Sequence, residues 1–369
     1  MGTRRIHCHV ARAAFTPRAA FTLVELLLAL GLFSILVLAL LRLLDTSLTI
    51  WSRTESSRDL LETSSSVLEL LAEDLRAVEG GPRGDLVGEW VRFDADQDGT
   101  RGAPMLRLRF VRQVSASERL AHASAEEIDP RALDLIETCW ALLPPRQAER
   151  DGRSVGVLWR GSRARGDPGT TSFFDAAFFD AGGRPAPGSL SDVIGGVLWF
   201  EAWFASSTSV LHDGWRLGND LADCSASWDA WSRGRPDPEL SPFNQPAAAR
   251  ADGRGRARDL PVLPRRVRIA LELERDVELK FRTRLSGEVS PDAKSFPVLD
   301  PDRLPPQGSC VLVDEEWMRI LSVAGGAVSV ERGARGTNPS AHAARTLVHH
   351  GERVVREIPL AVLREDWGP

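Results

Sequence analysis

The chain has 369 residues and a formal net charge of −5, with 46 lysines and arginines against 51 aspartates and glutamates. This length is enough for one large or two small globular domains plus a long helix. The acidic balance argues against a general nucleic-acid-binding surface, and it deepens to −9 without residues 1–20, which carry four arginines and no acidic residue.

A basic segment, residues 1–20, is followed by an apolar run, residues 21–41, in which Glu25 is the only charge. As a helix the run would be about 31 Å long, close to the thickness of the hydrocarbon core of a bilayer. It is too long for a conventional secretory signal peptide, and the basic flank predicts a cytoplasmic amino terminus. We therefore expect a single transmembrane helix. A carboxylate inside it costs on the order of 2.5–3.5 kcal/mol, so Glu25 should have a partner.

The sequence FTLVE at residues 21–25 resembles the amino-terminal signature of the type IV pilin and type II secretion pseudopilin superfamily. The resemblance implies that a prepilin peptidase cuts between Ala20 and Phe21 and that Phe21 is then N-methylated. Ala20 departs from the family, which prefers glycine before the cut. The resemblance also implies that Glu25 pairs with the N-terminal amine of a neighbouring subunit. An ordinary signal anchor with a tolerated glutamate is the alternative interpretation.

Apolar residues continue at helical spacing beyond the apolar run as far as Val78, and a Gly-Gly-Pro stop signal follows at residues 80–82. This pattern predicts one long helix from Thr22 to Val78, within a helical segment at residues 21–79. By resemblance the fold class is α+β. A long N-terminal helix, transmembrane in its first half, would pack on an antiparallel β-rich head.

An acidic loop follows the first predicted strand. Asp94, Asp96 and Asp98 precede a glycine with the spacing of the first half of a calcium-binding loop. The twelfth position is Met105 instead of a bidentate acid, so the segment is not an EF-hand. A weak calcium site and a solvated acidic turn both remain open as interpretations, and no other cofactor is predicted.

Alternating apolar residues predict the strands of the head, and the run at residues 193–204 is expected to form one long strand. The segment at residues 161–188 is rich in glycine, proline and charge, and we expect a long loop there. The pattern LPxxVxIxLxL at residues 263–273 follows an aromatic strand and tryptophan-containing loops. This order resembles the minor pseudopilin J of type II secretion, so residues 80–285 are interpreted as a head of that type. The other predicted strands of the head lie at residues 106–114, 139–143, 155–159 and 267–274.

Residues 286–350 depart from a typical J subunit and are interpreted as a small inserted β module. Short strands are predicted at residues 311–313, 317–323 and 328–330, joined by Asp-Glu-Glu and Gly-Gly turns. Residues 351–369 should supply the final head strand and a tail, with Pro359 favouring an edge position. The module would either contact a ligand or partner, or be an inert elaboration of the head.

The sequence contains no H-E-x-x-H, G-x-S-x-G or phosphate-binding G-x-x-x-x-G-K pattern, so we expect no enzymatic activity. The pair His349-His350 either binds a metal or consists of solvated loop histidines, and neither this pair nor the three cysteines beyond the leader have the spacing of a zinc site. One disulfide or none can form among these cysteines. Glu25 is therefore the one ionisable group whose position demands a functional explanation.

By resemblance, the protein is expected to be a minor pseudopilin near the tip of the periplasmic pseudopilus in type II protein secretion. Its expected partners are other minor and major pseudopilins, especially the I and K types, the prepilin peptidase and the inner-membrane secretion platform. It would span the inner membrane once, with its amino terminus cytoplasmic and its head periplasmic. The alternatives are a minor type IV pilin for adhesion or DNA uptake, and a membrane-anchored periplasmic binding protein or enzyme.

Overall fold

The computed structural model describes residues 22–92, 104–115, 118, 134–143, 156–166, 169–180, 183–205, 224–231, 261, 263–274 and 282–361. The chain divides into two compact units, residues 1–57 and 58–369. One long helix, α1 (Leu23–Arg76), contributes to both units. The strands are β1 (Leu86–Arg92), β2 (Pro104–Gln113), β3 (Leu135–Leu143), β4 (Val157–Ala164), β5 (Ser191–Gly195), β6 (Val197–Ala205), β7 (Cys224–Ser225), β8 (Trp228–Asp229), β9 (Arg266–Leu273), β10 (Ser295–Pro297), β11 (Cys310–Val313), β12 (Glu316–Ala324), β13 (Ala327–Ala334) and β14 (Glu352–Pro359).

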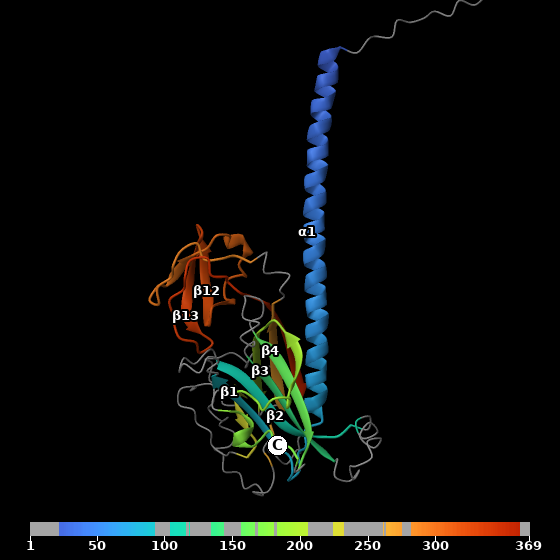
Figure 1. Cartoon of the computed structure of the whole chain (residues 1–369), viewed down its shortest axis with the longest axis vertical. Helices are drawn as coiled ribbons and strands as arrows, with labels where there is room; N and C mark the ends of the chain where they lie inside the picture. Colours follow the sequence, from blue (N-terminus) through green and yellow to red (C-terminus); the bar gives the residue numbers. More distant parts are fainter. Residues whose placement is uncertain are drawn as a thin grey trace, which may run out of the picture. The chain divides into compact units, whose positions relative to one another are not determined.

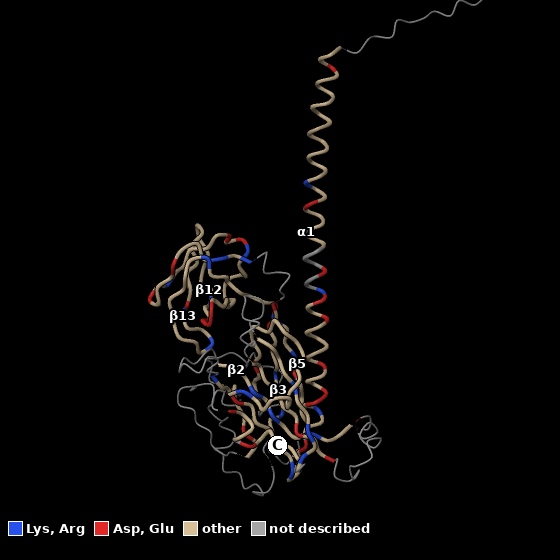
Figure 2. The backbone as a smooth tube through the Cα atoms, viewed as in Figure 1, with Lys and Arg blue, Asp and Glu red and all other residues tan. Residues whose placement is uncertain are grey.

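The first unit is the N-terminal part of α1, which presents apolar side chains to its surroundings on all sides. Residues Leu23–Leu48 are long and apolar enough to cross a membrane. Figure 2 shows how few charged residues lie along this stretch, which contains only Glu25, Arg42 and Asp45. Two hydroxyls inside it, those of Ser34 and Thr46, donate to carbonyls one turn earlier at 2.8 Å each, which satisfies them without water. This segment fits a single-pass membrane anchor.

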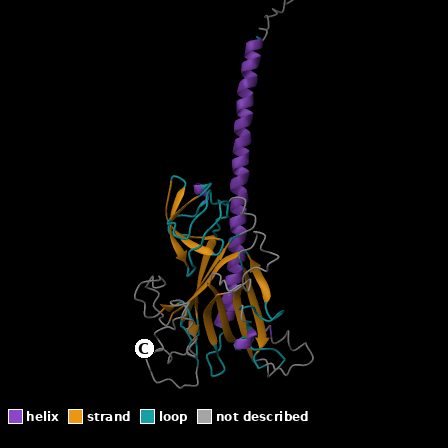
Figure 3. Ribbon diagram, turned by 60° about the vertical axis from the view of Figure 1, so that its left-hand side comes forward, coloured by secondary structure: helices purple, strands orange, loops and turns teal. Residues whose placement is uncertain are grey.

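The second unit contains the head, in which the last turns of α1 share one core with two antiparallel sheets (Figure 1). The larger sheet has the strand order β5-β4-β3-β2-β1-β8, and the smaller one has the order β14-β9-β6-β7. Strands and helix lie side by side in a second view as well (Figure 3). The predicted helix and the predicted α+β, pilin-like class are thus confirmed. The helical residues buried in the shared core are Leu60, Val67, Leu68, Leu71, Ala72 and Leu75.

The prediction of one long strand at residues 193–204 was wrong. The run is divided between β5, at the edge of the larger sheet, and β6, in the smaller sheet. Gly196 lies between them with φ of 73°, a left-handed conformation that glycine adopts without strain. A Cβ atom at this position would lie 2.2 Å from the carbonyl oxygen of Glu274. Because the chain turns here, two consecutive strands join different sheets.

The prediction of a long loop at residues 161–188 was also wrong in part. Its first four residues continue β4, and a short 3₁₀ helix, Ala176–Phe178, follows. Three phenylalanines, Phe173, Phe178 and Phe179, are buried with Leu190 against Cys139 of β3. The apolar side chains that cover the sheet explain why the segment packs in spite of its glycines and prolines.

Residues 282–351 include a third sheet, with the order β10-β13-β12-β11, and a second core of their own, while Leu312, Trp317 and Ala334 of this segment are buried in the core of the head. The two predicted turns are confirmed: Asp314 has φ of 52° after β11, and Gly325 and Gly326 have φ of 57° and 83° after β12. We call residues 285–348 the module. The chain then returns as β14, which lies at the edge of the smaller sheet as Pro359 predicted. The buried residues of the module core are Leu285, Val289, Phe296, Val298, Val311, Val313, Met318, Ile320, Val328, Val330 and Val348.

Candidate functional site

The first turn of α1 holds Glu25 in a reciprocal pair of contacts with Thr22. The backbone N–H and the hydroxyl of Thr22 both donate to Oε2 of Glu25, at 3.0 Å each. The backbone N–H of Glu25 in turn donates to the hydroxyl of Thr22 at 3.2 Å. This is a capping box, in which a residue before the helix and the third helical residue satisfy each other's N–H groups. The sequence TLVE therefore starts the helix as well as carrying the charge.

Glu25 thus has a partner within its own chain, which the sequence reasoning did not foresee. The signal was visible, because threonine three residues before glutamate at the start of an apolar run is the capping-box pattern. Among the described residues, the contacts of the carboxylate are to Oε2. The other oxygen, Oε1, can therefore accept from a second donor without loss of the cap.

Several predicted site residues lie outside the described part of the chain. These are Ala20 and Phe21 at the expected cleavage point, and Asp94, Asp96 and Asp98 in the acidic loop. Within the described ranges, no group of three or more histidine, cysteine, aspartate or glutamate side chains is placed to hold a metal ion. Cys139 and Cys310, which are both described, are free thiols.

A buried carboxylate fixes the end of α1 to the larger sheet. Asp74 accepts from Nε and Nη2 of Arg160 on β4, at 2.8 and 2.9 Å, and from Nε1 of Trp140 on β3 at 3.0 Å. Nε of Arg112 on β2 lies 3.1 Å from the same carboxylate. Three strands therefore converge on one helical residue. The residues are far apart in sequence, so no local pattern could have identified this cluster.

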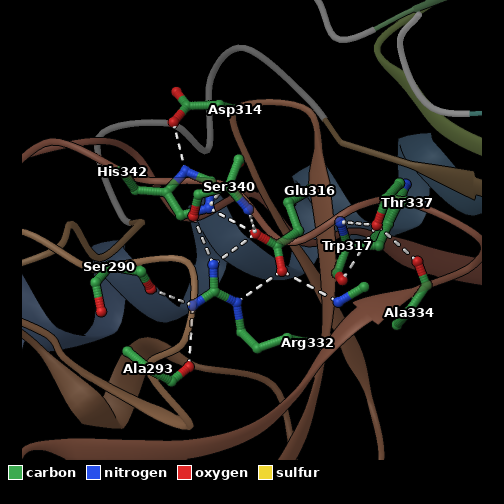
Figure 4. A network of polar contacts seen from close by, with 11 residues as sticks. Ser290, Ala293, Asp314, Glu316, Trp317, Arg332, Ala334, Thr337, Ser340 and His342 are labelled. Carbon is green, nitrogen blue, oxygen red and sulfur yellow. Dashed lines mark hydrogen bonds and ion pairs between the residues drawn. The ribbon is translucent and has the colours of Figure 1, made fainter.

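The module contains a second buried carboxylate, Glu316, at the centre of a polar network (Figure 4). Arg332 forms a bidentate pair with it, with Nε and Nη2 each 2.7 Å from a carboxylate oxygen. Nε2 of His342 lies 2.9 Å from Oε2. Burial alone would raise the pKa of Glu316, but the hydrogen bonds from Arg332 and His342 outweigh it and lower the pKa to about 2. Two backbone N–H groups also donate to this carboxylate, those of Gly333 and Ser340.

His342 is held between two carboxylates. Its Nδ1 lies 2.7 Å from Oδ2 of Asp314, on the side opposite Glu316. Burial alone would lower the pKa of His342, but the hydrogen bonds to Asp314 and Glu316 outweigh burial and raise the pKa to about 9. Both ring nitrogens therefore donate, and the imidazolium is saturated. A histidine in this state joins the turns of the module and has no lone pair available for a metal or for proton abstraction.

The pair His349-His350 lies where the module meets the smaller sheet. Nδ1 of His349 contacts Oε2 of Glu274 at 2.5 Å. The ring of His350 lies against Arg282, and burial, together with this positive charge, lowers the pKa of His350 to about 4. The two histidines thus contact residues at the connection between module and head: His349 contacts Glu274, and His350 contacts Arg282.

Residues 16–41 match a family profile described as the prokaryotic N-terminal methylation motif. No curated protein matches the chain. The matched residues contain the FTLVE sequence and end within the membrane-anchor segment of α1. The prokaryotic N-terminal methylation motif supports a place for this chain in the type IV pilin-like or pseudopilin family.

Proposed function

We propose that this protein is a minor pseudopilin of a type II secretion system, a structural subunit near the tip of a short periplasmic filament. The observation that carries the proposal is the N-terminal methylation motif, joined to an apolar helix whose first turn holds Glu25 by its own Thr22. The aromatic strand β6, the tryptophan-containing sequence after it and the LPxxV pattern before β9 support the J type. The role is assembly and not catalysis.

In this proposal a prepilin peptidase removes residues 1–20, and Phe21 becomes an N-methylated terminus. A terminal amine has a pKa of about 7.7–8 and is largely cationic near neutrality. The amine of a neighbouring subunit would bind Oε1 of Glu25, while Thr22 keeps Oε2. Two charges that meet in an apolar surrounding offset much of the cost of burying each one alone. The contact would set the register between the α1 helices of neighbouring subunits.

The same motif is also compatible with a minor type IV pilin. The identity of the proteins that bind this chain would distinguish between a secretion system and a pilus. We propose other minor and major pseudopilins and the inner-membrane secretion platform as partners, with the amino terminus cytoplasmic and the head periplasmic. Co-purification with secretion pseudopilins would support the first candidate. Co-purification with a pilus subunit alone would favour the second.

The charge of Glu25 can be tested apart from its capping role. Glu25→Gln keeps an amide oxygen that accepts from Thr22 but removes the charge, whereas Glu25→Ala removes both. We expect both variants to be processed normally and to lose co-purification with partner subunits. Glu55→Gln, at an exposed position of the same helix, is the matched control and should assemble like the wild type. Normal assembly of Glu25→Gln would contradict the charge pairing.

Processing is tested by mass spectrometry of the intact protein purified from membranes. We expect a chain that begins at Phe21 and carries one added methyl group. A chain that retains residues 1–20 would contradict the proposal and favour a simple signal anchor.

A further inference from the structure

The module is joined to the head at one corner. The chain leaves the smaller sheet after β9 and comes back into it at β14. Glu274, just after β9, accepts from Nε of Arg282 at 2.8 Å and contacts His349 of the returning chain. The module has its own core, and three of its residues, Leu312, Trp317 and Ala334, are also buried in the core of the head. This corner alone would leave the module free to turn.

A second contact, away from this corner, is centred on Arg335. The guanidinium carbon lies 3.9 Å from the ring centre of Trp317 and 4.7 Å from that of Trp199. Trp317 belongs to β12 of the module, and Trp199 belongs to β6 of the head. Nη2 of Arg335 donates to Oε2 of Glu272 on β9 at 2.7 Å. The two rings also contact each other edge to face, with centres 5.8 Å apart. One module side chain thus lies over an aromatic ring of the module and one of the head, and is paired with a head carboxylate.

The local backbone presents Arg335 for this contact. Arg335 has φ of 54° and Gly336 has φ of 73°, so the chain turns sharply just after β13. The carbonyl of Gly336 accepts from Nη2 of Arg92, at the end of β1 in the larger sheet. Trp199 also stacks on Trp90 of β1, with ring centres 5.0 Å apart. Both sheets of the head therefore contribute to the surface on which the module rests.

We propose that Arg335 is a latch that docks the module on the head. When Arg335 withdraws, the module turns as a unit about the Glu274–His349 corner. Arginine suits a reversible contact because its planar cation stacks on aromatic rings when docked, and because its weakly hydrated guanidinium costs less to take out of water again than an ammonium would. Nη1 of Arg335 is buried and has no hydrogen-bond partner among the described residues in the docked state, and it would gain one from water on release. This inference does not depend on the proposed role in secretion.

The latch is tested by the distance between two spin labels in the full chain in detergent. Cysteines replace Ser322 on the module and Ser191 on β5, which are both exposed, in a background whose native cysteines are changed to alanine. The unaltered latch should give one narrow distance distribution. Arg335→Ala should add a second, displaced population. Arg319→Ala removes an exposed arginine on the same module and should leave the distribution unchanged.

Amide hydrogen exchange on the same variants separates undocking from unfolding. If the latch is real, β11, β12 and β13 stay protected in Arg335→Ala while the distance distribution changes. An unchanged narrow distribution in Arg335→Ala would overturn the proposal. Loss of protection throughout the three strands would also overturn it, because Arg335 would then be needed for the module to fold.

Discussion

Asp74 is the residue through which α1 is fixed to the larger sheet, and its side chain is only 6% exposed. Replacing it with alanine leaves Arg160 and Arg112 without their shared carboxylate in a buried place. Removing one partner of a buried ion pair costs about 3–5 kcal/mol, and we expect Asp74→Ala to lower the free energy of unfolding by that amount. Chemical denaturation of the full chain in detergent measures it.

Glu73→Ala is the matched control, because Glu73 is the adjacent residue on the exposed face of the helix. Its expected effect is within about 0.5 kcal/mol. Equal losses for the two variants would show that the cluster around Asp74 contributes nothing specific.

His342 gives the module a defined dependence on pH. Its pKa is raised from the ordinary value of 6.5 to about 9 in the folded state, so folding favours the protonated form. The resulting stability, on the order of 3 kcal/mol, is complete below about pH 6.5 and is lost as the pH rises through about 9. Glu316 affects stability at acidic pH. Its pKa is lowered from 4.5 to about 2 in the folded state, so the stability that it contributes is complete above about pH 4.5 and is lost as the pH falls towards about 2.

We therefore expect the module to unfold more easily at about pH 9.5 than at about pH 6. Protection factors of the amides of β11 to β13, which compare each exchange rate with the intrinsic rate at the same pH, measure this difference. His342→Gln should flatten the dependence, since glutamine does not titrate. A dependence as steep in the variant as in the wild type would assign the effect to other groups.

At the scale of the elements, Gly196 decides where one strand ends and the next begins. Alanine there would have to adopt φ of 73° and would bring Cβ within 2.2 Å of the carbonyl oxygen of Glu274. The left-handed conformation costs roughly 1–2 kcal/mol, and overpacking adds roughly 1–3 kcal/mol. We expect Gly196→Ala to lower the free energy of unfolding by the sum of these two costs.

Gly188→Ala separates the two contributions. Gly188 has φ of 77°, but a Cβ atom there would meet no atom of the described residues within 4 Å, so only the conformational cost applies. A larger loss for Gly196→Ala than for Gly188→Ala in the same denaturation experiment would assign the difference to the clash. Equal losses would contradict the close approach at Glu274.

The edge strand β14 carries charged residues and a proline that affect how the smaller sheet ends. Exposed charges, Arg353 and Glu357, alternate with Val355 on its outer face, and Pro359 ends it without an N–H group. Charges and proline on an edge discourage pairing with another strand. These features of β14 disfavour pairing of the smaller sheet with a strand of another chain.

At the scale of the whole molecule, exposed apolar surface is concentrated in the N-terminal part of α1. Of the 24 large hydrophobic side chains exposed in the described part of the chain, 18 lie between Leu23 and Trp51. We expect residues 58–369 expressed alone to stay soluble without detergent, and the full chain to require detergent. Size-exclusion chromatography with and without detergent measures this. A full chain that stays monomeric in plain buffer would contradict the membrane-anchor assignment.

The long helix and most strands could be predicted because each depends on a local pattern, whereas the fold class was predicted from the family resemblance. An apolar run of membrane length, a helical leucine stripe as far as Val78 and the alternation at residues 267–274 each specify an element by the period of their side chains. The same holds for the turn at Gly325 and Gly326. The break at Gly196 was missed because the apolar pattern continues across it, although two adjacent glycines were its visible signal.

The sequence by itself determined the long helix, most of the strands, the apolar segment long enough to cross a membrane and the N-terminal motif. Only the tertiary structure decided that Asp74 meets Arg160, that Glu316 meets His342, and that Arg335 lies between Trp199 and Trp317. The reason is physical. The period of side chains along one element is a local property, whereas the pairing of a buried charge depends on which distant strands the fold brings within about 3 Å of it.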